Sequence, residues 1–426
     1  MPETAMSGVC SLPTCAQVCM VQCCVCKYDR YCGADHQKAC WGKHQSQCKF
    51  IKQALGLPAA LVDVAKFRWT HLKNDPVLQW TCLEFAAACG LVPLAQHLLD
   101  HGADKDIADP FNRTPLFVAC AYEMLGVAKL LVERGADVDM AAYNSRTPLI
   151  FVCEQGKLEA AKLLVEAGAD LNAKDTDGIS ALLAACDKGF PEVAKLLVER
   201  GAYVDTKDID GRTALIAACS NNMSEVAKLL VERGADVNPQ STSGDTALIL
   251  ACDEGMSEIA KLLVERGVDV NVKDAEGNTA LMLACAMGMS EVVKLLVERD
   301  ADVNTKATDG DTALMCACVM EMSEVVELLV ERGADVNTKD TTTGRTVLMC
   351  ACDKGMPEVA KMLVERGADV TAKNKEGGTA IMAACGDSMS EVAKLLIERG
   401  VDVNARKRAR RQLNEDQELV QLAAAV

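Results

Sequence analysis

The feature that most constrains the fold is a segment of about 33 residues that recurs along most of the chain. One copy reads DTDGISALLAACDKGFPEVAKLLVERGAYVDTK and covers residues 175–207. A Thr or Ser opens each copy, and successive anchors lie 33 residues apart, except for one step of 34 residues. The anchors are Thr81, Thr114, Thr147, Ser180, Thr213, Thr246, Thr279, Thr312, Thr346 and Thr379. A fixed period of this length is typical of stacked repeats, in which each unit buries its apolar face against its neighbours.

Each copy predicts two short helices followed by an extended segment, which we call the finger. We expect Ser180 to cap the first helix and Gly189 to end it. Pro191 opens the second helix, whose Val and Leu residues fall on one face. Gly201 is expected to end that helix in the left-handed conformation. The Asp-rich stretch that follows has the composition of a turn, which predicts a hairpin-like finger.

The repeated pattern D-x-x-G-x-T-A/P-L, A-C-x-x-G and E-V-A-K-L-L-V-E-R-G-A-D-V-N resembles the ankyrin repeat. The resemblance implies a mainly α fold, an ankyrin-repeat α-solenoid of about ten repeats over residues 77–404. The His of the family's T-P-L-H is absent. Glu84 stands there in the first copy and apolar residues stand there in the others, which predicts apolar packing between repeats.

Residues 1–50 form a different kind of sequence, with nine of the 22 cysteines and two of the five histidines. Thiolates and imidazoles this close together, in a segment too small for its own core, indicate structural zinc. A disulfide framework would require secretion, and the N-terminus lacks the basic-then-apolar order of a signal peptide.

The run from Cys23 to Cys48, spaced C-x2-C-x5-C-x3-H-Q-x3-W-x2-H-x3-C, resembles the MYND zinc finger. The resemblance implies two Zn²⁺ ions in interleaved sites. The implied ligands are Cys10, Cys15, Cys32 and His36 for one ion, and Cys23, Cys26, His44 and Cys48 for the other. The first pair is spaced more widely than in the family, so Cys15 with Cys19 is an alternative to Cys10 with Cys15.

Gln37 and Trp41 match the MYND residues that help form a shallow groove for short proline-containing peptides. They lie four residues apart on a helical stretch, so they share one face. The competing interpretation is that Trp41 only covers the zinc core.

Two further segments flank the repeats. Residues 51–76 place apolar residues on one helical face and are expected to form a connector that caps the array. Residues 405–426 depart from the repeat and are expected to form a basic tail or capping helix. The basic run at 406–411 is compatible with a nuclear address and with a solvated cap.

The chain's net charge is −16, of which residues 1–50 and 405–426 contribute about +2 each, so the segment between them carries about −20. This acidity disfavours nucleic acid as a partner. No apolar run approaches the roughly 18 residues of a membrane span, so we expect a cytoplasmic and/or nuclear protein. Glu and Lys spaced by three on the second helices indicate a solvated, ion-paired outer face. Asp residues of the fingers are better candidates for contacts with a basic partner.

The in-phase cysteines, such as Cys186 and Cys219, and the in-phase methionines, such as Met223, are interpreted as core residues. No catalytic motif is present, so no enzyme activity is expected. We expect an adaptor that holds a protein along the concave face and fingers of the array. The alternative is a substrate-receptor or regulatory subunit of a chromatin-modifying or ubiquitin-ligase complex. The candidate partner-binding residues are Asp208, Ile209, Asp210, Arg212, Asp187, Lys188, Ser220, Asn221, Asp253 and Glu254.

Overall fold

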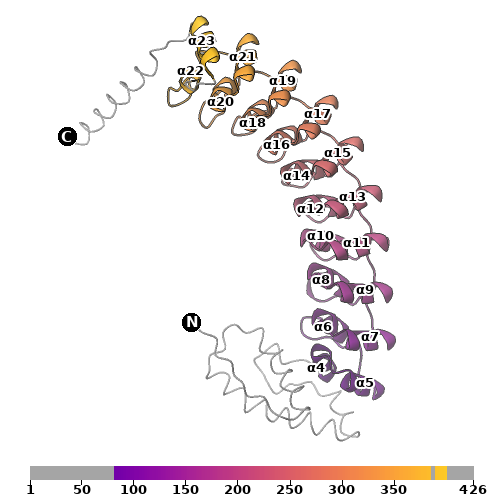
Figure 1. The fold of residues 1–426 in the computed structure, drawn as a ribbon. Helices are drawn as coiled ribbons and strands as arrows, with labels where there is room; N and C mark the ends of the chain where they lie inside the picture. Colours follow the sequence, from indigo (N-terminus) through magenta and orange to yellow (C-terminus); the bar gives the residue numbers. More distant parts are fainter. Residues whose placement is uncertain (1–80, 385–388, 401–426) are drawn as a thin grey trace, which may run out of the picture. The chain divides into compact units, whose positions relative to one another are not determined.

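The structure, a computed structural model, describes residues 81–384 and 389–400. These residues form pairs of short helices joined by fingers (Figure 1). The first helices of the pairs are α4 (Cys82–Cys89), α6 (Pro115–Ala121), α8 (Pro148–Glu154), α10 (Ala181–Asp187), α12 (Ala214–Ser220), α14 (Ala247–Asp253), α16 (Ala280–Ala286), α18 (Ala313–Val319), α20 (Val347–Asp353) and α22 (Ala380–Ala383). The second helices are α5 (Val92–Asp100), α7 (Leu125–Glu133), α9 (Leu158–Glu166), α11 (Pro191–Glu199), α13 (Ser224–Glu232), α15 (Ser257–Glu265), α17 (Ser290–Glu298), α19 (Ser323–Glu331), α21 (Pro357–Glu365) and α23 (Ser390–Glu398).

The repeated Thr or Ser begins the first helix, as the sequence predicts. Thr213 Oγ1 accepts the amide of Ile216 at 3.3 Å, and Ser180 Oγ accepts the amide of Leu183 at the same distance. These bonds satisfy an amide that the helix cannot pair internally. A Pro or a small residue at the next position then continues into the helix.

Glycines in the left-handed conformation end the helices at the predicted places. Gly189 has φ 72° after α10, and Gly201 has φ 87° after α11. Asp300 takes the corresponding position after α17 with φ 60°. Three residues without a glycine's freedom also adopt positive φ after the first helix, where other copies have glycine. They are Glu123, Asn222 and Glu321, and the sequence pattern did not predict this.

The described residues divide into two compact units. The first reaches Ala185 and includes Glu199–Ala202, and the second comprises Cys186–Val198 and the residues from Tyr203 onward. Within each unit, consecutive first helices pack on one another, and so do consecutive second helices (Figure 1). The two kinds of helix therefore form two layers, with the core between them.

The core repeats the same positions in every copy. The in-phase cysteines are buried at each described position from Cys120 to Cys352, while Cys385 lies outside the described residues. Met223, Met256, Met289, Met356 and Met389 are buried as well, and Met322 is half-buried. The interpretation of both columns as packing residues is confirmed.

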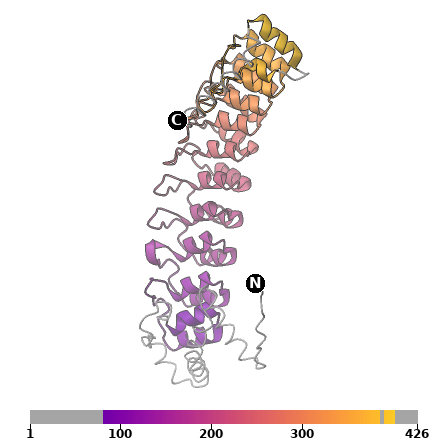
Figure 2. The same cartoon turned by 90° about the vertical axis from the view of Figure 1, so that its left-hand side faces the viewer.

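The fingers project to one side of the helices (Figure 2). They are hairpin-like, with isolated antiparallel bridges such as Gln240 with Thr246 and Lys273 with Thr279. Neighbouring fingers are joined through the backbone, for example by the amide of Thr308 and the carbonyl of Glu276 at 2.9 Å.

The outer face of the second helices carries ion pairs, as expected. Glu258 pairs with Lys261 at 3.4 Å and Glu291 with Lys294 at 3.2 Å, all with exposed or half-exposed side chains. None of the helices in the described part of the chain has both the length and the apolar character needed to cross a membrane.

Candidate partner-binding surface

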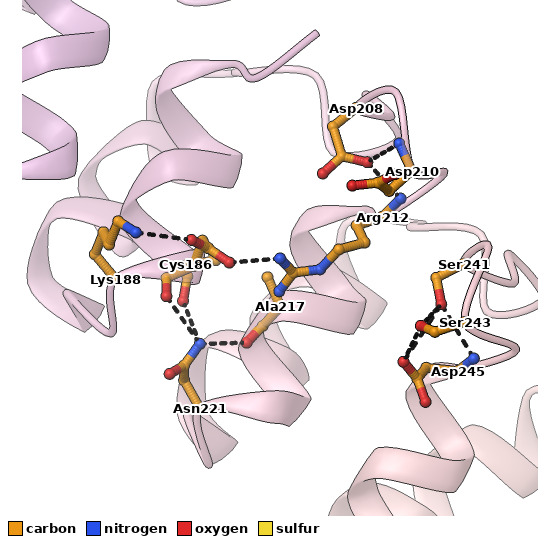
Figure 3. Close-up of polar contacts among 11 residues, drawn as sticks. Cys186, Lys188, Asp208, Asp210, Arg212, Ala217, Asn221, Ser241, Ser243 and Asp245 are labelled. Atoms are coloured by element: carbon orange, nitrogen blue, oxygen red, sulfur yellow. Dashed lines mark hydrogen bonds and ion pairs between the residues drawn. The ribbon is translucent and has the colours of Figure 1, made fainter. Parts of the chain in front are cut away.

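The finger before α12 is built around the carboxylate of Asp208. Its Oδ1 accepts the amides of Asp210 at 3.0 Å and of Arg212 at 2.8 Å (Figure 3). The side chain therefore holds the turn closed and leaves the tip, Ile209 and Asp210, projecting from it. Ile209 is 70% exposed and Asp210 is also exposed.

Arg212 joins this finger to the end of α10. Its Nη1 lies 2.8 Å from Asp187 Oδ1, and Lys188 Nζ lies 3.3 Å from Asp187 Oδ2 (Figure 3). All three side chains are between about a quarter and a half exposed. A partner can therefore reach these charges, but they already compensate one another.

Asn221 closes the end of α10 from the next repeat. Its Nδ2 donates to the carbonyls of Cys186 at 3.1 Å, Asp187 at 3.2 Å and Ala217 at 3.1 Å (Figure 3). Carbonyls at a helix C-terminus lack partners within the helix, so this amide satisfies them. Asn221 is exposed to a partner, but its side chain also has a structural role at the end of α10.

The following finger uses hydroxyl groups in place of the Asp208 carboxylate. Ser241 Oγ accepts the amide of Asp245 at 3.1 Å and lies 2.8 Å from Ser243 Oγ (Figure 3). The amide of Thr242 donates to the carbonyl of Asp210 at 2.8 Å, which fixes the two finger tips side by side.

The Asp residues of the fingers fall into two groups. Asp175 is buried, and its Oδ1 accepts the amides of Asp177 at 3.0 Å and Ile179 at 2.9 Å. Asp205 also binds the backbone, but it accepts the amide of Asp236 in the next repeat at 2.8 Å. Asp177 and Asp210 are exposed at the tips. The finger carboxylates thus serve the fold at the turn positions and face solvent at the tips.

The remaining predicted residues, Ser220, Asp253 and Glu254, are exposed at the ends of α12 and α14. Together with the finger tips they form what we call the tip-and-end surface. Asp187 joins the other two residues into one contact network, because its carboxylate pairs with Arg212 and its backbone carbonyl accepts from Asn221. Asp253 and Glu254 stand apart, at the end of α14.

A groove that the sequence interpretation missed lies two repeats further on. It has a volume of about 440 Å³ and is lined by Val319 and Met320 at the end of α18, and by Asp309 and Asp311. Its signal in the sequence is the change from Asp253-Glu254 to apolar pairs at the same repeat positions.

The buried cysteines have no nucleophilic character. Burial raises the pKa of the Cys219 and Cys252 thiols to about 12, so both are neutral at ordinary pH. In the part of the chain that the structure describes, no three His, Cys, Asp or Glu side chains are grouped to hold a metal ion.

The expected zinc ligands and the expected peptide groove lie outside the described residues. These are Cys10, Cys15, Cys23, Cys26, Cys32, His36, His44, Cys48, Gln37 and Trp41. The expected helical connector at 51–76 and the expected tail at 405–426 also lie outside them.

Comparison with known proteins identifies the repeats. The family model described as Ankyrin repeats (3 copies) matches in overlapping segments, at residues 47–142, 82–175, 139–208, 182–274, 266–340 and 338–407. The crystal structure of the ankyrin repeat domain of Bcl-3, described as a unique member of the IkappaB protein family, is 32% identical. The match covers 51% of this chain and 98% of that chain, with a TM-score of 0.44. No curated protein matches. Because the family model matches well over half of the sequence, the chain belongs to the ankyrin-repeat family.

Proposed function

We propose that this chain is a non-catalytic adaptor whose repeats hold a protein partner on the tip-and-end surface. One observation carries the proposal: the residues exposed at the finger tips and first-helix ends differ between copies more than the packing residues do. The tips carry Thr176, Ile209 and Ala275 at one repeat position, whereas the core position is a buried cysteine in every copy from Cys120 to Cys352.

The geometry supports a rigid recognition surface. The tip at Ile209 and Asp210 is closed by side-chain bonds within its own finger and joined to the next finger by the bond from the Thr242 amide to the Asp210 carbonyl. A surface that is already ordered loses little conformational entropy when a partner binds. Because the exposed residues vary while the helix pairs keep the same arrangement, each repeat can offer a partner a different set of side chains.

Affinity capture followed by mass spectrometry tests the proposal. The bait variant combines Ile209→Ala, Asp210→Ala and Glu254→Ala on the tip-and-end surface. Its matched control combines Glu192→Ala, Glu225→Ala and Glu258→Ala on the outer face of α11, α13 and α15. We expect the wild type and the control to retain one common partner, and the surface variant to lose it. Equal retention by both variants would contradict the proposal.

We further propose that residues 1–50 bind two Zn²⁺ ions and recruit a short proline-containing peptide. The support is the spacing of the Cys and His residues and the Gln37–Trp41 pair in the sequence. Zinc here would stabilise the fold of a segment too small for its own core. Zinc content measured by mass spectrometry should be two ions in the wild type and in Trp41→Ala, and lower in Cys26→Ala. Gln37→Ala and Trp41→Ala should lose capture of proline-containing peptides, and zinc loss in Trp41→Ala would assign that residue to packing.

A further inference from the structure

Unlike the polar or charged ends of α8, α10, α12 and α14, the ends of α16 and α18 are apolar, and they border a groove that lies among α16, α18 and α20. These helices pack side by side in the second unit (Figure 1). Val319 is 45% exposed and Met320 is 47% exposed, and both line the groove together with Ala286 and the buried Met315. Met287, the residue after α16, is also 49% exposed but does not line the groove. Val319 and Met320 therefore leave large apolar side chains partly in contact with water at the end of α18.

The other copies show that this apolar character is not required by the fold. The same two positions are polar or charged at the ends of five first helices: Glu154-Gln155 (α8), Asp187-Lys188 (α10), Ser220-Asn221 (α12), Asp253-Glu254 (α14) and Asp353-Lys354 (α20). Only the first two copies, with Ala88-Cys89 and Ala121-Tyr122, are apolar there as well. Clusters of exposed apolar side chains with polar surroundings mark interaction sites more often than they serve packing.

One side of the groove is acidic. Asp309, Asp311 and Asp340 line it from the two fingers before α18 and α20. Asp340 is engaged in its own finger, where it accepts the Thr343 hydroxyl at 2.6 Å and the Arg345 amide at 2.8 Å. Arg345 also lines the groove, and its guanidinium pairs with Asp353.

Asp309 and Asp311 complete the acidic side. Asp309 is exposed and Asp311 is half-buried, with the Asp311 amide 3.0 Å from Asp309 Oδ1. Burial raises the pKa of Asp311, and the charges of Asp309 and Asp340 raise it further. A cation bound beside these carboxylates would relieve their repulsion.

We propose that this groove binds a peptide segment of a partner protein that places a large apolar side chain against Val319 and Met320 and an adjacent Lys or Arg against Asp309 and Asp311. The apolar floor removes the first side chain from water, and the carboxylates select the second by charge. The proposal rests on the proposed adaptor function and adds a second contact, in a groove outside the tip-and-end residues named above.

The test selects phage-displayed random dodecapeptides on the full-length chain and measures the best peptide, labelled with fluorescein, by fluorescence anisotropy. The groove variant is Val319→Ser with Met320→Asn. It introduces the Ser-Asn pair found at Ser220-Asn221, so the new residues are ones that the repeat already has at these positions. The control, Asp253→Ser with Glu254→Asn, makes the same change at the end of α14. Circular dichroism checks that both remain folded.

We expect the selected peptides to share a Leu, Met, Ile or Phe within three positions of a Lys or Arg. The groove variant should weaken binding by about tenfold or more, and the control by less than about twofold. Asp309→Asn with Asp311→Asn should weaken binding by about threefold and reduce its dependence on salt. The Asn side chain keeps the acceptor for the Asp311 amide, so the finger is preserved.

Other outcomes overturn the inference in distinguishable ways. The selected peptides could still bind the groove variant and lose binding in Ile209→Ala with Asp210→Ala. That result would support the adaptor function and contradict the groove as the binding site. Failure to select any peptide would count against the groove, while the capture experiment decides the adaptor function separately. Self-association in sedimentation velocity that disappears in the groove variant would assign the groove to a second copy of this chain.

Discussion

Arg212 Nη1 lies 2.8 Å from Asp187 Oδ1 and so links the finger before α12 to the first helix of the preceding repeat. Arg146 and Arg345, at the same repeat position, pair instead with Glu154 and Asp353, eight residues further along in their own repeats. The eighth residue after Arg212 is Ser220, which has no charge. The arginine therefore reaches across to the neighbouring repeat.

A double-mutant cycle with Arg212→Gln and Asp187→Asn should give a coupling energy of about 0.5 kcal/mol, because both side chains are about one-third exposed. The free energies come from urea unfolding followed by circular dichroism. In a Ser220→Asp background, the coupling energy between Arg212 and Asp187 should be smaller, because the new carboxylate offers Arg212 a partner within its own repeat. A coupling that Ser220→Asp leaves unchanged would show that the position of Ser220 does not direct the pairing.

The repeat period and the caps were enough to predict the helices of the described residues. Thr213 and Gly201 mark helix boundaries because each has one dominant backbone role, and the recurrence of the cysteines and methionines marks the core. Period and composition do not show which polar side chains bind within the fold. Asp175 and Asp177 are two residues apart in the same finger, and only the first is buried.

The candidate site was harder to predict for the same reason. Asn221 is exposed and Asp208 is half-buried, both at positions that vary between copies, yet their side chains satisfy backbone groups of the fold. The groove at Val319 was not predicted, because an apolar residue in a repeat is usually a core residue. The structure shows instead that Val319 is partly exposed and lines the groove beside two fingers.

Asp300→Gly should stabilise the chain by about 1 kcal/mol. Asp300 holds φ 60°, a region that costs a side-chain-bearing residue free energy and costs glycine little. Gly267→Asp is the matched reverse change, since Gly267 has φ 79° at the same position one repeat earlier. No heavy atom lies within 4 Å of a Cβ built at Gly267, so backbone strain alone should lower the stability of the Gly267→Asp variant. Urea midpoints measure both, and a lower midpoint for Asp300→Gly would refute the strain argument.

The buried repeat cysteines should resist alkylation in the native chain. Burial raises the pKa of Cys120, Cys219 and Cys252 to about 12, so almost no thiolate is present at pH 8. Iodoacetamide treatment followed by peptide mass spectrometry should leave these residues unmodified until urea is added. Rapid modification without urea would mean that the second unit or the α6 region opens readily under native conditions.

Glu84 should make the first repeat less stable as pH rises from about 4.5 to about 7. Its side chain is fully buried in α4, and burial raises the pKa of its carboxyl to about 7, although hydrogen bonds with Thr81 act in the opposite direction. Thr81 N donates to Glu84 Oε2, and Glu84 N donates to Thr81 Oγ1 at 3.2 Å. Among the described residues, no group donates to Glu84 Oε1.

Below the unfolded pKa the carboxyl is neutral in both states, and between the two pKa values only the unfolded chain loses the proton. Stability therefore falls across that window by on the order of 2–3 kcal/mol and is level above it. Glu84→Gln keeps the reciprocal cap with Thr81 and carries no charge, so its stability should not show this fall. Hydrogen exchange of the α4 amides, compared between the two proteins at pH 5 and pH 7.5 after correction for intrinsic rates, isolates this group from the other titrations. Parallel pH profiles would mean that Glu84 is ionised in the folded chain at pH 5, and that an additional group compensates its charge.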